Sequence, residues 1–140
     1  MNIKEFDAVQ ESVVDTPINK KKNSYEIKNS NGSVMSKLGY FDYSKKGFDW
    51  ILIANVETKP EFRGMGLASK LVSEFCKDSQ NKFPNKGLYL LVRIDNDPAI
   101  YLYKKNGFKT AKKYKMTDGM YLVMYKGNAD KQQLINMNYS

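Results

Sequence analysis

The sequence predicts a mixed α/β (α+β) fold, with a mostly antiparallel twisted sheet around one parallel β-α-β unit. Three observations predict it. Residues 24–56 form three strand-like runs separated by turn residues, residues 67–76 repeat apolar side chains at helical spacing, and residues 88–92 are apolar almost throughout. A strand, a helix and a buried strand in succession are typical of two parallel neighbours joined by a crossover.

The first three predicted strands are consecutive and antiparallel. Residues 25–28 alternate between apolar and polar, and the turn-forming residues 29–32 follow them. Residues 33–43 alternate more loosely and end at a second turn, residues 44–47. Residues 48–56 are too continuously apolar for an edge strand, so we expect them at the centre of the sheet.

Two helices and a hairpin follow. The first helix, of about four turns, has one apolar face, formed by Leu67, Ala68, Leu71, Val72, Phe75 and Cys76. The second begins at Asn96, a good N-cap, and ends before Gly107, which is typical of a helix C-terminus. Residues 108–116 and 120–126 are interpreted as the strands of a hairpin.

The two ends of the chain are less regular. Ile3, Phe6, Val9 and Val13 allow either a helical stripe or a short strand, and the lysines at 20–22 are interpreted as a solvated connector rather than a nucleic-acid arm. We expect one domain over residues 1–126. Residues 127–140 form a polar tail that is either disordered or a short helix.

The composition excludes several classes of chemistry. The chain has no histidine and a single cysteine, Cys76, which rules out a Ser-His-Asp triad, a Cys-His dyad, a histidine-ligated or multi-cysteine metal site and an intramolecular disulfide. It also has no apolar signal core or membrane-spanning stretch, so we expect a cytoplasmic protein. The net charge of +8 favours anionic partners, and by itself does not choose among a nucleic acid, a phosphorylated cofactor and a membrane surface.

Two glycines stand where the third strand ends and the first helix begins. Gly64 and Gly66 lack a Cβ, so a ligand can approach the main chain closely. The first turn of the helix also presents unpaired N–H groups and the positive end of its dipole, and together these features are typical of a diphosphate site. A tight strand-to-helix turn is the alternative. Two rival motifs fit badly, because Ser69 replaces a dinucleotide-site glycine and no Gly-Lys-Ser/Thr is present.

Asn96, Ala99 and Tyr103 form a second candidate cluster. Ala99 and Tyr103 are four residues apart and therefore share one helix face, while Asn96 lies just before the helix and can offer its amide to a ligand. A tyrosine in this position is also typical of a half-buried core residue with its hydroxyl at water. The pattern alone leaves both interpretations open.

Taken together, the two segments resemble the GNAT superfamily of acyl-CoA-dependent N-acetyltransferases. The family's phosphate-binding signature, Arg/Gln-x-x-Gly-x-Gly/Ala, is matched by residues 63–68. Its later signature, Asn-x-x-Ala-x-x-x-Tyr followed by Gly-Phe, is matched by Asn96, Ala99, Tyr103, Gly107 and Phe108. The resemblance covers about residues 24–126 and implies a GNAT-like fold, in which the third strand splays away from its parallel neighbour.

The resemblance also implies acetyl-CoA as co-substrate and a place for each of its parts. The pantetheine arm would lie in the splay and pair with the main-chain edge of Val56, Glu57 and Thr58. The diphosphate would rest on Arg63, Gly64, Met65, Gly66, Leu67, Ala68 and Ser69. Asn96 and Ala99 would contact the pantetheine, and Tyr103 would lie near the thioester sulfur.

The implied reaction is direct attack of an amine on the acetyl carbonyl, without a covalent enzyme intermediate. Tyr103 would act as the general acid for the departing thiolate, and a backbone N–H would stabilise the oxyanion. Some family members that acetylate protein N-termini use a glutamate on the strand before the asparagine signature, where this chain has Leu91. Glu57 is the nearest alternative base by sequence, with water or another carboxylate as further options.

The acceptor amine is left open among a protein N-terminus, a lysine, a polyamine and a small metabolite. Only 23 residues precede Ser24, so the wall that the family places before the first hairpin is abbreviated. The acceptor groove is therefore either open or completed by another subunit, as in a homodimer. Two other functions are an acyl-CoA-binding module with little or no turnover and, from charge alone, a nucleic-acid-binding domain.

Overall fold

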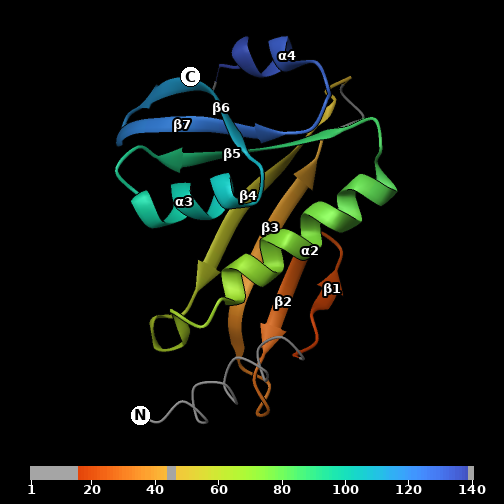
Figure 1. Cartoon of the computed structure of the whole chain (residues 1–140), viewed down its shortest axis with the longest axis vertical. Helices are drawn as coiled ribbons and strands as arrows, with labels where there is room; N and C mark the ends of the chain where they lie inside the picture. The colour runs from red at the N-terminus through yellow and green to blue at the C-terminus, as the bar shows by residue number, and fades with distance from the viewer. Residues whose placement is uncertain (1–15, 44–46, 139–140) are drawn as a thin grey trace.

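The computed structural model describes residues 16–43 and 47–138, in which helices flank one seven-stranded sheet (Figure 1). The elements are β1 (Asn19–Lys21), β2 (Ser24–Lys28), β3 (Val34–Asp42), β4 (Trp50–Thr58), the 3₁₀ turn η2 (Pro60–Phe62), α2 (Leu67–Lys82), β5 (Gly87–Arg93), α3 (Asp97–Lys105), β6 (Lys109–Met116), β7 (Gly119–Lys126) and α4 (Lys131–Ile135). The apolar pattern at Ile3, Phe6, Val9 and Val13 and most of the turn expected at 44–47 lie outside the described residues.

The predicted mixed α/β fold is confirmed. The strands lie in the order β1-β2-β3-β4-β5-β7-β6, which places β4 at the centre, as its continuous apolar run favoured. β2, β3 and β4 are antiparallel neighbours, whereas β4 and β5 are parallel and α2 forms the crossover between them. β6 and β7 form the expected antiparallel hairpin.

The lysine run at 20–22 is not only a connector. Its first part belongs to β1, which pairs with β2 so that Lys20 lies opposite Tyr25. The Nζ of Lys20 also forms ion pairs with Glu74 at 3.1 Å and Asp78 at 2.7 Å, both on α2. All three side chains of this edge strand are exposed, so the sequence has no alternation of apolar and polar residues that would predict it.

The chain after Gly127, expected as a polar tail, includes α4 and packs onto the sheet. Leu134 of α4 is fully buried, and the indole N–H of Trp50 donates a hydrogen bond to the carbonyl of Asp130 at 2.8 Å. The short-helix alternative is therefore the one observed. The sequence signal is weak because a single buried leucine anchors the helix.

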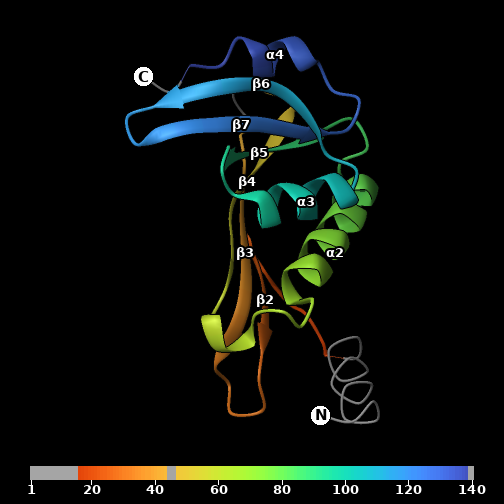
Figure 2. The ribbon, with the colours of Figure 1, turned by 60° about the vertical axis from the view of Figure 1, so that its left-hand side comes forward.

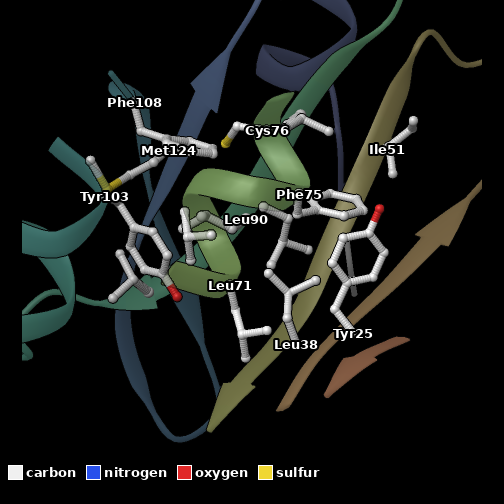
Figure 3. Close-up of a cluster of buried hydrophobic side chains, with 14 of the residues drawn as sticks. Tyr25, Leu38, Ile51, Leu71, Phe75, Cys76, Leu90, Tyr103, Phe108 and Met124 are labelled. Carbon is white, nitrogen blue, oxygen red and sulfur yellow. The ribbon is translucent and has the colours of Figure 1, made fainter. Parts of the chain in front are cut away.

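The sheet carries an apolar core on each face. On one face α2 and α3 cover the larger core (Figure 3), whose members include Tyr25, Leu38, Ile51, Leu71, Phe75, Leu90 and Met124. On the other face α4 covers a smaller core, formed by Trp50, Tyr89, Val123 and Leu134. Within the described ranges no helix has the length and apolarity needed to cross a membrane.

Among the described residues, no α-helix covers the second face of β2, of β3 and of the C-terminal half of β4. Figure 2 shows α2 on one side of these strands and no described α-helix on the other side. The side chains exposed on that open side include Lys37, Phe41, Asn55 and Glu57. The sheet therefore presents polar and charged groups to solvent beside its centre.

Tyr25 links the first strands to α2 through its hydroxyl, which donates to Asp78 Oδ2 at 2.5 Å. Burial and this hydrogen bond raise the pKa of the phenol. We expect Tyr25→Phe to lower the free energy of unfolding by about 1.5 kcal/mol, because it removes a partly buried hydrogen bond to a charged group. Chemical denaturation measures this, and the exposed Tyr101→Phe is the control. Equal losses in both variants would contradict the interpretation.

Candidate active site

β4 and β5 pair over a short length and then separate. Residues 50–52 lie opposite residues 87–89, whereas β4 continues to Thr58 and β5 to Arg93. The β3–β4 ladder is irregular near the point of separation: Gly39 pairs with Asn55 and Tyr40 with Ile53, which leaves Ala54 as an extra residue on β4. Such a bulge increases the local twist, so it helps to turn the end of β4 away from β5.

The separation leaves a cavity of about 200 Å³ between the two strands, here called the slot. Four of the residues singled out in the sequence line it: Val56, Asn96, Ala99 and Tyr103. Leu91, at the position where the resemblance implies a glutamate in some family members, also lines the slot. The splay expected from the two signatures is thus present, and the second signature lies beside it.

Residues 64–69, here called the glycine corner, are the end of the connection between β4 and α2 together with the first residues of α2. Gly64 and Gly66 have φ of +81° and +79°, and apart from the adjacent chain no atom lies within 4 Å of the place where a Cβ would stand. Both are in the left-handed region that favours glycine. Gly66 is the N-cap of α2, and its carbonyl accepts a hydrogen bond from Lys70 N at 3.0 Å. The amides of the first helical turn therefore have no helical carbonyl before them.

Asn96 caps α3 with one of its side-chain atoms, so only the other is available to a ligand. Its Oδ1 accepts a hydrogen bond from the amide of Ala99 at 3.3 Å and so caps α3. Within the part of the chain that the structure describes, its side-chain nitrogen has no recorded partner. The group left for a ligand in the slot is therefore a hydrogen-bond donor.

Tyr103 is a core residue whose hydroxyl reaches the slot. The residue is 8% exposed, its ring packs edge-on against Phe108 with centroids 5.8 Å apart, and its hydroxyl points away from Phe108 and Met124 (Figure 3). Among the described residues this hydroxyl has no recorded partner, yet none of their fully buried side-chain oxygens is unpaired. It is therefore accessible. Burial raises the pKa of Tyr103 to about 12.

The residues at the end of β4 that were predicted to contact the pantetheine face two different environments. Val56 lines the slot, whereas the Glu57 side chain faces the open side of the sheet. The carbonyl of Glu57 accepts a hydrogen bond from Ser36 Oγ at 3.2 Å, and that of Thr58 accepts one from Arg63 Nε at 3.1 Å. Both carbonyls therefore accept hydrogen bonds from side chains of the same chain. The hydrogen bond of Arg63 connects the residue just before the glycine corner to the end of β4.

A second cavity, of about 440 Å³, lies on the open face of the sheet, and is here called the open-face cavity. Ala54 and Asn55 line both this cavity and the slot, so the two meet at the bulge in β4. Glu57 Oε2 lies 3.5 Å from Asn55 Nδ2 inside the open-face cavity. The carboxylate considered as a base is therefore near the junction, on the face opposite to α2.

A polar cluster that sequence reasoning missed closes one end of the slot. Arg93 Nη1 donates to Asp118 Oδ2 at 3.2 Å and to Tyr121 OH at 3.3 Å, and Tyr121 OH donates to Asp118 at 2.7 Å. The hydrogen bond with Asp118 raises the pKa of Tyr121. This cluster holds the β6–β7 turn against the end of β5. No local signal predicts it, because Arg93 and Tyr121 lie directly opposite each other in the β5–β7 ladder but are 28 residues apart in the sequence.

A known protein family matches the region that contains these features. The family model described as FR47-like protein matches residues 49–116, which run from the start of β4 to the end of β6. The match therefore includes both strands of the slot, the glycine corner and Tyr103.

Two curated relatives are similar over part of this region. An N-alpha-acetyltransferase of Saccharolobus solfataricus is 35% identical over 60 residues, which are 43% of this chain and 36% of that protein. The L-amino acid N-acetyltransferase AaaT of Escherichia coli is 37% identical over 67 residues, which are 46% of this chain and 41% of that protein. The match thus spans about two fifths of the length of these relatives.

The similarity to solved structures extends further along the chain. The crystal structure of Ard1 from Thermoplasma volcanium superimposes with a TM-score of 0.64 and 27% identity. The alignment covers 74% of this chain and 69% of that one. The shared architecture therefore includes most of the sheet as well as the matched segment.

Proposed function

Because this chain belongs to the GNAT superfamily, we propose that it is an N-acetyltransferase, which moves the acetyl group of acetyl-CoA to a primary amine. The observation that carries the proposal is the slot between β4 and β5. The glycine corner follows β4 in the chain, and Tyr103 lines the slot. A diphosphate, a flexible arm and a thioester need these three environments in this order. The relatives' names agree with acetyl transfer.

The glycine corner is proposed to hold the diphosphate. The first-turn amides of α2 point outward from a helix N-terminus, where the dipole favours anions. The missing side chains of Gly64 and Gly66 leave space for phosphate oxygens next to the main chain. The pantetheine then enters the slot along Val56, and the amide nitrogen of Asn96 is available to one of its carbonyl groups.

The proposed chemistry is a direct transfer. The neutral amine attacks the acetyl carbon, the carbonyl oxygen gains negative charge, and collapse of the intermediate breaks the C–S bond and releases the thiol. A main-chain N–H of β4 near the bulge would donate to the oxyanion. The sulfur gains one proton and the nitrogen loses one, so the two changes balance.

Tyr103 is proposed to donate to the departing sulfur. A phenol with a pKa of about 12 is a weaker acid than a thiol, whose ordinary pKa is about 8.5. Full transfer of the phenol's proton to the sulfur is therefore favourable only if another proton reaches the phenol in the same step. We expect a strong hydrogen bond to the sulfur, with the proton released by the amine returning to the phenol through water.

Glu57 is proposed as the group that takes the extra proton of the acceptor's ammonium form, which must be lost before the neutral amine attacks. Its carboxylate lies in the open-face cavity, which shares Ala54 and Asn55 with the slot. An amine that approaches the thioester from the open face would pass this carboxylate. Leu91, in contrast, offers no proton acceptor inside the slot.

A thiol-release assay with acetyl-CoA and a broad amine panel tests the proposal. We expect turnover with at least one amine and direct binding of acetyl-CoA in calorimetry. If acetyl-CoA bound but no amine released thiol, the chain would be an acyl-CoA-binding module instead. Absence of both signals from folded protein would contradict the assignment.

A further inference from the structure

The open-face cavity carries charges that the transfer reaction itself does not require. Lys22 and Lys37 line it together with one carboxylate, Glu57. Both lysines are exposed. Within the described ranges neither forms an ion pair within 4 Å, although Lys37 lies directly opposite Glu57 on the neighbouring strand. The cavity therefore holds more positive than negative side-chain charge.

The carboxylate on the other neighbouring strand is already paired with a different lysine. Glu26 lies opposite Lys37 on β2, but its Oε1 pairs with Lys21 Nζ at 2.9 Å. The pKa of Glu26 is lowered by that hydrogen bond with Lys21, with further contributions from Lys28 and Lys37. Lys37 therefore remains available to an anion that enters from solvent.

Two uncharged features shape the rest of the cavity. Gly39 lies opposite Asn55 at the junction with the slot, and a Cβ there would meet only the carbonyl oxygen of Asn23, at 3.9 Å. Its backbone needs no glycine, so the missing side chain serves as open space. At the other end Phe41 is 47% exposed and stacks on Tyr43, with centroids 6.2 Å apart.

We propose that the open-face cavity binds the acceptor, and that the acceptor is a small amine bearing a carboxylate, such as a free α-amino acid with an apolar side chain. This inference rests on the proposed function, because the acceptor's amine must reach the thioester. The amine lies at Asn55 and Glu57, the carboxylate lies at Lys37 and Lys22, and the side chain packs on Phe41. Lys37 is two residues along β3 from Gly39, about 7 Å from the junction, within reach of its long side chain.

The charge distribution argues against a cationic acceptor. In a polyamine a second positive charge would be repelled by the two lysines, and only one carboxylate in the cavity would attract it. An amine with a carboxylate instead pairs with charges of both signs, and charge-assisted hydrogen bonds are the stronger ones. The separation of Lys37 from the bulge also predicts that it affects acceptor binding and leaves the chemical step unchanged.

Three matched amines test the proposal in the thiol-release assay: phenylalanine, phenylalaninamide and phenethylamine. We expect phenylalanine to have the highest kcat/KM by about tenfold or more, the effect of one charge-assisted hydrogen bond. The amide is a demanding control, because its less basic amine has a larger reactive fraction at neutral pH. Equal or better turnover of the amide, of a polyamine or of a peptide N-terminus would overturn the proposal.

Variants separate this inference from the proposed function. We expect Lys37→Gln to raise the KM for phenylalanine about tenfold with kcat unchanged, and to leave phenethylamine unaffected. Lys77→Gln, on the exposed face of α2, is the matched control. Gly39→Val should block phenylalanine turnover while acetyl-CoA still binds. Turnover of other amines with no effect of either cavity variant would overturn the inference alone, whereas no turnover of any amine would overturn the proposed function as well.

Discussion

Gly66→Val is expected to weaken acetyl-CoA binding at least a hundredfold, the equivalent of about 3 kcal/mol, while the protein still folds. Gly66 is the N-cap of α2, with a φ of +79° and open space where a Cβ would stand. A branched side chain there would occupy the space proposed for the diphosphate. It would also strain the backbone, so the first-turn amides would lose both room and alignment.

The chain offers a matched control for backbone strain. Gly32 also has a positive φ, +86°, and open space where a Cβ would stand, but it lies in the turn between β2 and β3. Gly32→Val should therefore lower the free energy of unfolding by about 1–3 kcal/mol and leave acetyl-CoA affinity unchanged. Calorimetric titration of both variants makes the comparison. Similar affinities for the two would remove the glycine corner from the binding site.

Tyr103→Phe is expected to lower kcat about a hundredfold, since a positioned proton donor contributes about 10²–10⁴. The affinity for acetyl-CoA should change by no more than about twofold, because the ring still fills its place against Phe108. The free energy of unfolding should also stay nearly constant, since the hydroxyl has no recorded partner among the described residues. Steady-state kinetics with a calorimetric Kd separates these effects.

The pH dependence of kcat is a second test of the role of Tyr103. Because burial raises its pKa to about 12, the phenol keeps its proton throughout the range in which the protein is assayed. Any change in kcat below about pH 10 therefore belongs to other groups. We expect wild type and Tyr103→Phe to have pH profiles of the same shape. An alkaline decline present only in the wild type would contradict this, as would an undiminished kcat in the variant.

Much of the fold could be predicted because local patterns and global topology agree. The apolar run of β4, the single apolar face of α2 and the capped start of α3 each specify one element, and crossover geometry orders them. β1 and α4 were the exceptions. β1 exposes all three of its residues, and α4 depends on Leu134, so neither has a periodic apolar signal.

The candidate site was predicted less completely. Motif spacing indicated Gly66, Asn96 and Tyr103, because backbone freedom, a cap and a helix face are local properties. The bulge at Ala54 is not local, since it depends on how β3 and β4 align. Asn55 lies at the junction of two cavities for this reason, and the sequence contains no sign of it.

The central claim is that acetyl-CoA lies in the slot with its diphosphate on the glycine corner. Amide hydrogen exchange with and without CoA tests it most directly. We expect increased protection at Val56, along residues 64–69 and at the start of α3, with little change along β6. Protection at a different surface, or binding that leaves the glycine corner unprotected, would contradict the claim.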